Sequence, residues 1–176
     1  ESERILEEEE NIRFKEELGE VPNLFAYPYG EYNNLAKKIA EENFLASFGQ
    51  HSGSSHASLG FHELPRFSMN ETYGNMDRFI LAAQSLPFII SEINPLDTVL
   101  SENPPSYGFT LENNLDRVKQ LKCFVSGIGE ANVTVIGKRV EVRSTKKFFR
   151  PRHRINCTMP DESGRWRWFG RQFLIK

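Results

Sequence analysis

The stretch "FAYPYGEY" (residues 25–32) is the part of the sequence that says most about the fold of the first half of the chain. With the two residues before it, it predicts a short buried strand that ends in a Pro-Tyr-Gly turn. Pro28 fixes its own φ and removes a backbone donor, and Gly30 permits a sharp or left-handed turn. Such a turn holds the backbone at the end of a strand, where a ring and a peptide N–H can point into a cleft. The alternative is a turn that only ends a strand.

Strand and helix patterns alternate on both sides of this turn. Asn33 or Asn34 is a candidate N-cap for the helix that follows, with Leu35 and Ile39 facing inward. This order is typical of α/β structure. We expect helices over residues 2–18, 33–44 and 76–87, and strands within residues 23–30, 45–49 and 61–69, the last interrupted by Pro65.

The pattern changes after residue 90. Residues 91–108 are rich in Pro, Asn and Ser and predict an ordered linker. Residues 109–176 contain short runs such as "ANVTVIG" and "KRVEVRST", separated by turn signals such as Gly137-Lys138. Short strands with frequent turns predict an antiparallel β-sandwich.

Charge and cysteine content each permit two interpretations. Residues 137–176 hold twelve of the 22 Lys and Arg residues against three acidic ones. This pattern fits half-buried strands with solvated faces, or a basic surface that attracts a polyanion. Cys123 and Cys157 form no C-x-x-C pair, which excludes a zinc ribbon and leaves a disulfide or two buried thiols. No apolar run is long enough for a membrane span.

Two segments together resemble a known family. "LFAYPYGEYNNLAKKIAEENFLASFGQHSG" and "LPRFSMNETYGNMDRF" are similar to the C-terminal third of the polysaccharide deacetylases of the nodulation-protein-B-like group, carbohydrate esterase family four. The resemblance is closest to the envelope branch and covers about residues 1–90. The later stretch "RINCTMPDESGRWRWFGRQF" resembles the β domain that follows the catalytic domain in some bacterial members.

The resemblance implies a fold and a reaction. The family fold is an irregular β/α barrel, so we expect a partial (β/α) barrel over residues 1–90, followed by the β-sandwich. The reaction is metal-assisted hydrolysis of an N-acetyl group, in which an Asp and two His hold a divalent metal, usually zinc, and a second Asp is the base. In the family, these residues precede the Pro-Tyr-Gly motif.

That motif order predicts where the metal lies. The sequence has no Asp before Asp77 and no His before His51. We therefore expect the metal ligands and the base upstream of Glu1, no metal or cofactor in this part of the enzyme, and no amide hydrolysis by this part alone. Self-association, or pairing with the upstream part, would complete the structure.

The family's site residues carry over to few positions. The resemblance implies that the backbone N–H of Tyr29 stabilises the oxyanion and that Pro28 and Gly30 shape the substrate-binding turn. Where many relatives have an Arg that orients the Asp base, this sequence has Ala26. Arg66 is the candidate substitute, since Arg can hold a carboxylate bidentately, and the alternative is a structural ion pair. The family's late Leu-x-His acid has no clear match.

The histidine pair in "HSGSSH" (residues 51–56) resembles a metal motif only superficially. His51 and His56 are five residues apart, whereas the family's zinc pair is four apart, and they follow the Pro-Tyr-Gly motif. Gly53 and three serines predict a loop. Loops after strands form the active-site rim of β/α barrels, so His51 is a candidate for contact with the sugar.

Two tryptophans near the C-terminus are candidates for sugar binding. In a strand, Trp166 and Trp168 share one face and Arg165 and Arg167 the other. The tryptophans would pack in the core, or form a platform for sugar rings. Nucleic-acid binding is not expected, because no recognised nucleic-acid motif is present.

These observations predict part of a metal-dependent N-deacetylase that acts on an N-acetylated envelope or exopolysaccharide glycan. The expected location is the bacterial cell envelope, periplasmic or extracellular. The alternative is a non-catalytic carbohydrate-binding or structural module.

Overall fold

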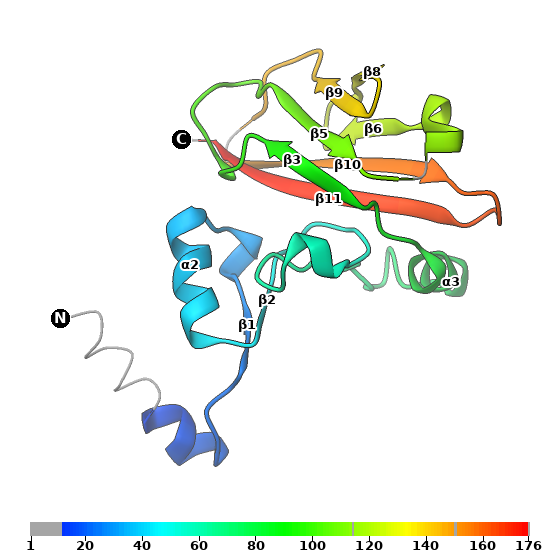
Figure 1. The fold of residues 1–176 in the computed structure, drawn as a ribbon. Helices are drawn as coiled ribbons and strands as arrows, with labels where there is room; N and C mark the ends of the chain where they lie inside the picture. Colours follow the sequence, from blue (N-terminus) through cyan, green and yellow to red (C-terminus); the bar gives the residue numbers. More distant parts are fainter. Residues whose placement is uncertain (1–11, 114, 150, 176) are drawn as a thin grey trace.

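The computed structural model describes residues 12–113, 115–149 and 151–175, and these form two layers. In Figure 1, the strands from β3 onward lie above, and α2, β1, β2 and α3 lie below them. The long strands β10 (Arg152–Pro160) and β11 (Trp166–Ile175) run along the boundary between the two layers. Residues 12–18 are helical, and the rest of the predicted first helix lies outside the described residues.

The lower layer contains one strand–helix–strand unit around the Pro-Tyr-Gly turn. β1 (Leu24–Ala26) pairs in parallel with β2 (Ala46–Phe48), and α2 (Asn34–Asn43) connects them. α2 begins where predicted, because the Asn33 side chain accepts a hydrogen bond of 2.7 Å from the Ala36 N–H. Leu35 and Ile39, expected to face inward, are exposed. A small core within this unit consists of Tyr27, Tyr32 and Ala40.

The predicted fold class is wrong, because the partial β/α barrel expected before the antiparallel β-sandwich does not form within the described residues. Within the described ranges, β1 and β2 form a two-stranded sheet, and no sheet closes into a barrel. The expected strand within residues 61–69 is reduced to a single bridge between Phe48 and Leu64. β1 and β2 are each three residues long, and a loop that contains Pro65 follows them. Two paired strands are too few to close a sheet into a barrel, since closure takes about eight strands. The chain continues through α3 (Met76–Gln84) into a different sheet.

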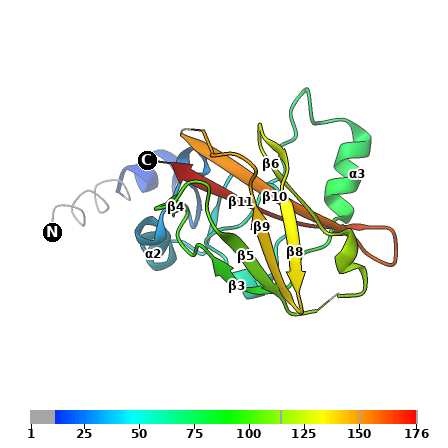
Figure 2. The same cartoon turned by 90° about the horizontal axis from the view of Figure 1, so that it is seen from above.

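The upper layer consists of two sheets packed face to face. The five-stranded sheet has the order β4, β11, β10, β6, β7, and β4 runs parallel to β11. The four-stranded sheet has the order β3, β5, β9, β8, and Figure 2 shows it lying over β10 and β11. The remaining bounds are β3 (Ile90–Asn94), β4 (Val99–Leu100), β5 (Tyr107–Leu111), β6 (Lys122–Val125), β7 (Gly129–Glu130), β8 (Asn132–Ile136) and β9 (Arg139–Arg143).

The two sheets share one apolar core. The register of β6 and β10 places Cys123 opposite Cys157, and the two form a disulfide, which decides the choice that the sequence leaves open. Alternate residues of β10 are buried, as expected for a strand with one face on a core. The largest fully buried apolar side chains are Tyr107, Phe88, Phe109, Phe173, Leu111, Ile155 and Met159.

Three further elements are short 3-10 helices, and one of them carries the Pro-Tyr-Gly turn. They are η1 (Pro28–Gly30), η2 (Ala57–Leu59) and η3 (Leu115–Gln120). None of the helices formed by the described residues has the length and apolar character needed to cross a lipid bilayer.

Candidate functional site

The Pro-Tyr-Gly turn has an unusual backbone. η1 follows β1 directly, and Tyr29 adopts φ 56° and ψ 11°, a left-handed conformation that is rare for a bulky residue. The Tyr29 side chain is 68% exposed, so the turn faces solvent. Gly30 also has a positive φ of 67°, and a Cβ there would lie 2.4 Å from Cβ of Gln50. Only glycine fits at that position, and strained backbone of this kind is concentrated at functional sites.

A buried glutamine of β11 holds the turn from behind. Nε2 of Gln172 donates hydrogen bonds of 3.0 Å to the carbonyl oxygens of both Tyr29 and Gly30. Gln172 is 1% exposed, and its Oε1 accepts from Nε of Arg154 at 2.9 Å. Arg154 also donates to Oε1 of Gln50 at 3.2 Å. The hydrogen-bonded chain Gln50–Arg154–Gln172 therefore fixes the two peptide planes that follow the Tyr29 N–H.

Arg152 of β10 adds a second support. It forms an ion pair with Glu31, and its guanidinium lies 5.3 Å from the ring centroid of Tyr29. This distance permits a cation–π contact. Residues from the two halves of the sequence therefore meet at the turn. Gln172, Arg152 and Arg154 are missing from the site predicted by sequence, and no sequence signal points to them, because their contacts depend on how the layers pack.

His51 lies behind the turn in a buried polar cluster. Its side chain is 4% exposed, and its Nδ1 has no hydrogen-bond partner in the described part of the chain. Burial, and next the positive charges of Arg171, Arg154 and Arg66, lower the pKa of His51 to about 3. His51 is therefore neutral over the physiological range.

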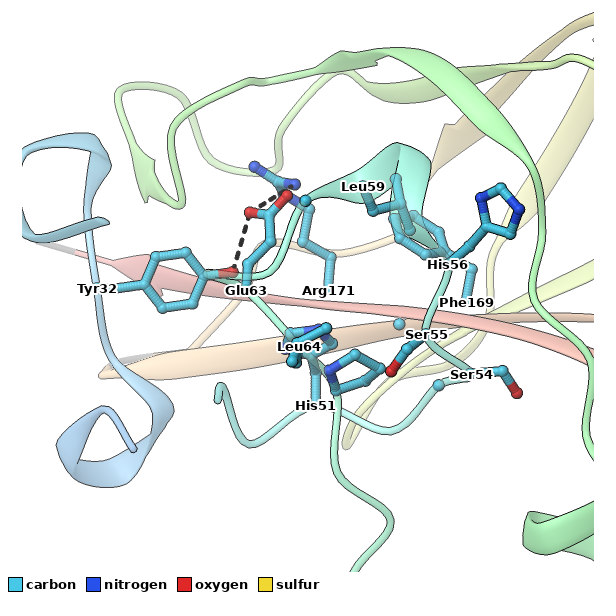
Figure 3. A pocket seen from close by; sticks show the side chains of 14 residues that line it. Tyr32, His51, Ser54, Ser55, His56, Leu59, Glu63, Leu64, Phe169 and Arg171 are labelled. Carbon is cyan, nitrogen blue, oxygen red and sulfur yellow. Dashed lines mark hydrogen bonds and ion pairs between the residues drawn. The ribbon is translucent and has the colours of Figure 1, made fainter. Parts of the chain in front are cut away.

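Glu63 is the centre of this cluster (Figure 3). It accepts a hydrogen bond from the Tyr32 hydroxyl at 3.4 Å, and it pairs with Lys37 at 3.4 Å and with Arg171 at 3.8 Å. Burial, and next the negative charge of Glu63, raise the pKa of Tyr32. The cavity beside His51 has a volume of about 20 Å³, which is room for water and not for a sugar ring.

Arg66 and His56 make local contacts. Nε of Arg66 donates to the Gly49 carbonyl at 2.6 Å, and the Arg66 N–H donates to the His51 carbonyl at 2.9 Å. These bonds tie the start of the "HSGSSH" loop to the segment around Arg66. Nδ1 of His56 accepts from the Ser58 N–H at 3.1 Å, as an N-cap of η2. The two histidines therefore have different roles. His51 is buried, and His56 is the N-cap of η2.

The two tryptophans differ in their surroundings. Trp168 packs edge-on against Phe67 at 5.2 Å, faces Arg78 at 5.2 Å, and donates from Nε1 to Asn156 at 3.3 Å. Trp166 is 42% exposed and lines a groove beside α3. The tryptophans point to the same side of β11, as expected from strand geometry, but Trp166 is the more accessible one.

A metal does not fit the residues described. Over residues 12–113, 115–149 and 151–175, no three His, Cys, Asp or Glu side chains form a group that could hold a metal ion. His51 is surrounded by positive charge, which opposes cation binding.

No protein-family model matches the sequence, and no curated protein matches it at a significant level. The family resemblance therefore stays a prediction from the quoted motifs.

Proposed function

We propose that this chain is part of a metal-dependent polysaccharide N-deacetylase that acts on N-acetylated glycans of the bacterial envelope or on exopolysaccharide. The observation that carries the proposal is the turn Pro28–Tyr29–Gly30. This turn follows a parallel strand, faces solvent, adopts a strained left-handed backbone and is held by Gln172.

The turn has the properties required of an oxyanion donor. Backbone N–H groups stabilise a developing negative charge best when they are already fixed in place, because no reorganisation is then needed during the reaction. Gln172 orders the peptide groups after Tyr29 by binding both carbonyl oxygens. In the proposed reaction, the Tyr29 N–H donates to the oxyanion formed from the acetyl carbonyl.

The metal ligands and the general base would come from residues outside this sequence. When bound, zinc or a similar divalent metal would polarise the acetyl group and activate water. The described residues supply the turn and its support.

The disulfide supports an envelope location. Cys123 and Cys157 are fully buried and bonded to each other. Disulfides form and persist in oxidising compartments such as the periplasm and the extracellular space. A periplasmic or extracellular enzyme would meet its polysaccharide there.

The proposal is tested by acetate release from an N-acetylglucosamine polymer, measured with the purified full-length protein and zinc. Gln172→Leu removes both hydrogen bonds to the turn, and we expect kcat to fall about tenfold or more with little change in KM, because the fixed donor is needed in the transition state. Thr134→Ala, on the exposed face of β8, is the control and should leave both constants unchanged. A wild-type protein that releases no acetate would refute the proposal.

The second candidate function is carbohydrate binding without catalysis. The exposed Trp166 beside a groove favours it. Glycan binding by a full-length protein that releases no acetate would decide for this alternative.

A further inference from the structure

A preformed groove lies between α3 and the turn that joins β10 to β11, away from the Pro-Tyr-Gly turn. Its volume is about 240 Å³. One wall comes from α3 and the other from the start of β11 and the residues just before it. The lining residues are Asp77, Ile80, Leu81, Gln84, Gly164, Arg165 and Trp166.

The helical wall presents a single face. Asp77, Ile80, Leu81 and Gln84 lie at positions i, i+3, i+4 and i+7, which share one side of a helix. The two polar residues therefore stand about 10 Å apart along the helix axis, with the apolar pair between them. An apolar floor with polar groups at each end is the usual composition of a small-molecule site.

The opposite wall is held rigidly. Oδ1 of Asp161 accepts hydrogen bonds from the N–H of Ser163 at 2.9 Å and of Arg165 at 3.0 Å, which fixes the turn. The Leu86 N–H donates to the Trp166 carbonyl at 2.8 Å, which joins β11 to the segment that follows α3. A ligand would therefore bind without ordering the walls first, and preorganisation of this kind favours affinity.

The side chains point to one class of ligand. Trp166 is 42% exposed, whereas Trp168, two residues later on the same face, is packed and hydrogen-bonded. An exposed indole presents a flat apolar surface with a polar edge. The carboxylate of Asp77, the amide of Gln84 and the guanidinium of Arg165 are planar groups that can each bind two neighbouring hydroxyls. Arg165 already lies 4.0 Å from a carboxylate oxygen of Asp161 and donates from Nε to Ser163 Oγ at 3.0 Å, so its charge is matched within the turn. Among the described residues, the groove therefore has no unpaired cation to attract an anion, and it favours a neutral ligand rich in hydroxyls.

We propose that this groove is a saccharide-binding subsite, in which a pyranose ring stacks on Trp166 and its hydroxyls bind Asp77, Gln84 and Arg165. Trp166 and Gln172 are six residues apart on β11, which corresponds to about 20 Å. The groove is therefore remote from the Pro-Tyr-Gly turn, and a glycan that reaches both must be a polymer. This last point rests on the proposed deacetylase function, whereas saccharide binding at the groove does not depend on it.

The test is isothermal titration calorimetry of this chain with a chitin hexasaccharide at low and high salt. We expect saturable binding that changes little with salt, because the ligand is neutral. Trp166→Ala should weaken binding about tenfold. Gln84→Leu, an exposed change on α3 that does not threaten folding, should weaken it about fivefold through loss of a hydrogen bond.

The matched control is Phe124→Ala, which removes an aromatic ring of nearly equal exposure, 41%, from β6 outside the groove. It should bind as the wild type does. The inference is overturned if the wild-type chain does not bind, or if both the Trp166 and the Gln84 variants bind as tightly as the wild type. Acetate release without binding at this groove would refute the subsite alone, and binding without acetate release would refute the deacetylase proposal alone.

Discussion

Gly30 shows how one residue can set the geometry of the proposed site. Its φ of 67° disfavours any side chain, and a Cβ would lie 2.4 Å from Cβ and 2.5 Å from the backbone nitrogen of Gln50. We expect Gly30→Ala to lower the free energy of unfolding by about 2 kcal/mol or more, since strain and overlap add. Urea unfolding monitored by circular dichroism measures this change.

Gly127 provides the control for that substitution. Its φ is 71°, but nothing lies within 4 Å of the added Cβ. Gly127→Ala should therefore lower the free energy of unfolding by about 1 kcal/mol, from backbone strain alone. Equal losses in the two variants would show that the contact with Gln50 does not matter.

Because His51 is buried, we expect the free energy of unfolding to depend on pH. Its pKa in the folded protein is about 3, lowered by burial and then by Arg171, Arg154 and Arg66, against about 6.5 in the unfolded chain. Below pH 6.5, the unfolded chain therefore binds a proton that the folded protein excludes. The contribution of His51 to the free energy of unfolding is fully present above pH 6.5. It falls by about 1.4 kcal/mol per pH unit as the pH drops toward 3.

The measurement is urea unfolding at pH 7.5 and pH 5 for the wild type and for His51→Gln, whose side chain does not titrate. The variant should lose less stability between the two pH values. A smaller loss will remain, because burial also lowers the pKa of His153. An unchanged pH dependence in His51→Gln would contradict the assignment.

At the scale of elements, the disulfide links β6 to β10 within the five-stranded sheet. Its cysteines are separated by 34 residues, and closing a loop of that length restricts the unfolded chain. We expect the double variant Cys123→Ala, Cys157→Ala to lose about 2–4 kcal/mol of unfolding free energy. Alkylation of the denatured wild-type protein without reductant should modify no thiol, and two modified thiols would contradict the bridge.

At the scale of the whole molecule, the two layers meet along β11. The Ser54 N–H donates to the Trp168 carbonyl at 3.1 Å, and Leu86 forms a bridge with Arg167. A Cβ on Gly170 would lie 2.1 Å from the Ser52 carbonyl oxygen, so the backbones touch here. These contacts join the backbone of the lower layer directly to β11.

We therefore expect both layers to unfold together. In a urea titration followed by NMR, amide signals from α2 and from β9 should disappear with one midpoint, and Gly170→Ala should lower both midpoints equally. Two separate transitions would show that residues 24–88 and the two sheets are independent folding units.

Local structure followed from local sequence at several places. Asn33 caps α2 as predicted, and the alternating run at residues 132–136 is strand β8. Asn75, whose role was not predicted, caps α3 in the same way. Pro28 and Gly30 marked the turn correctly, because φ restriction and φ freedom are properties of single residues. The barrel expectation failed because strand and helix order does not determine how many strands pair or where a sheet ends.

The sequence by itself determined the helix caps, the strand periodicity and the Pro28–Gly30 turn, since each depends on residues that are close along the chain. The tertiary structure decided which strands pair, that Cys123 meets Cys157, and that Trp166 is exposed while Trp168 is packed. It also placed Gln172 against Tyr29, 143 residues away in sequence. Contacts of that kind depend on sheet register and layer packing, which the free energy of the whole chain selects and which no short pattern encodes.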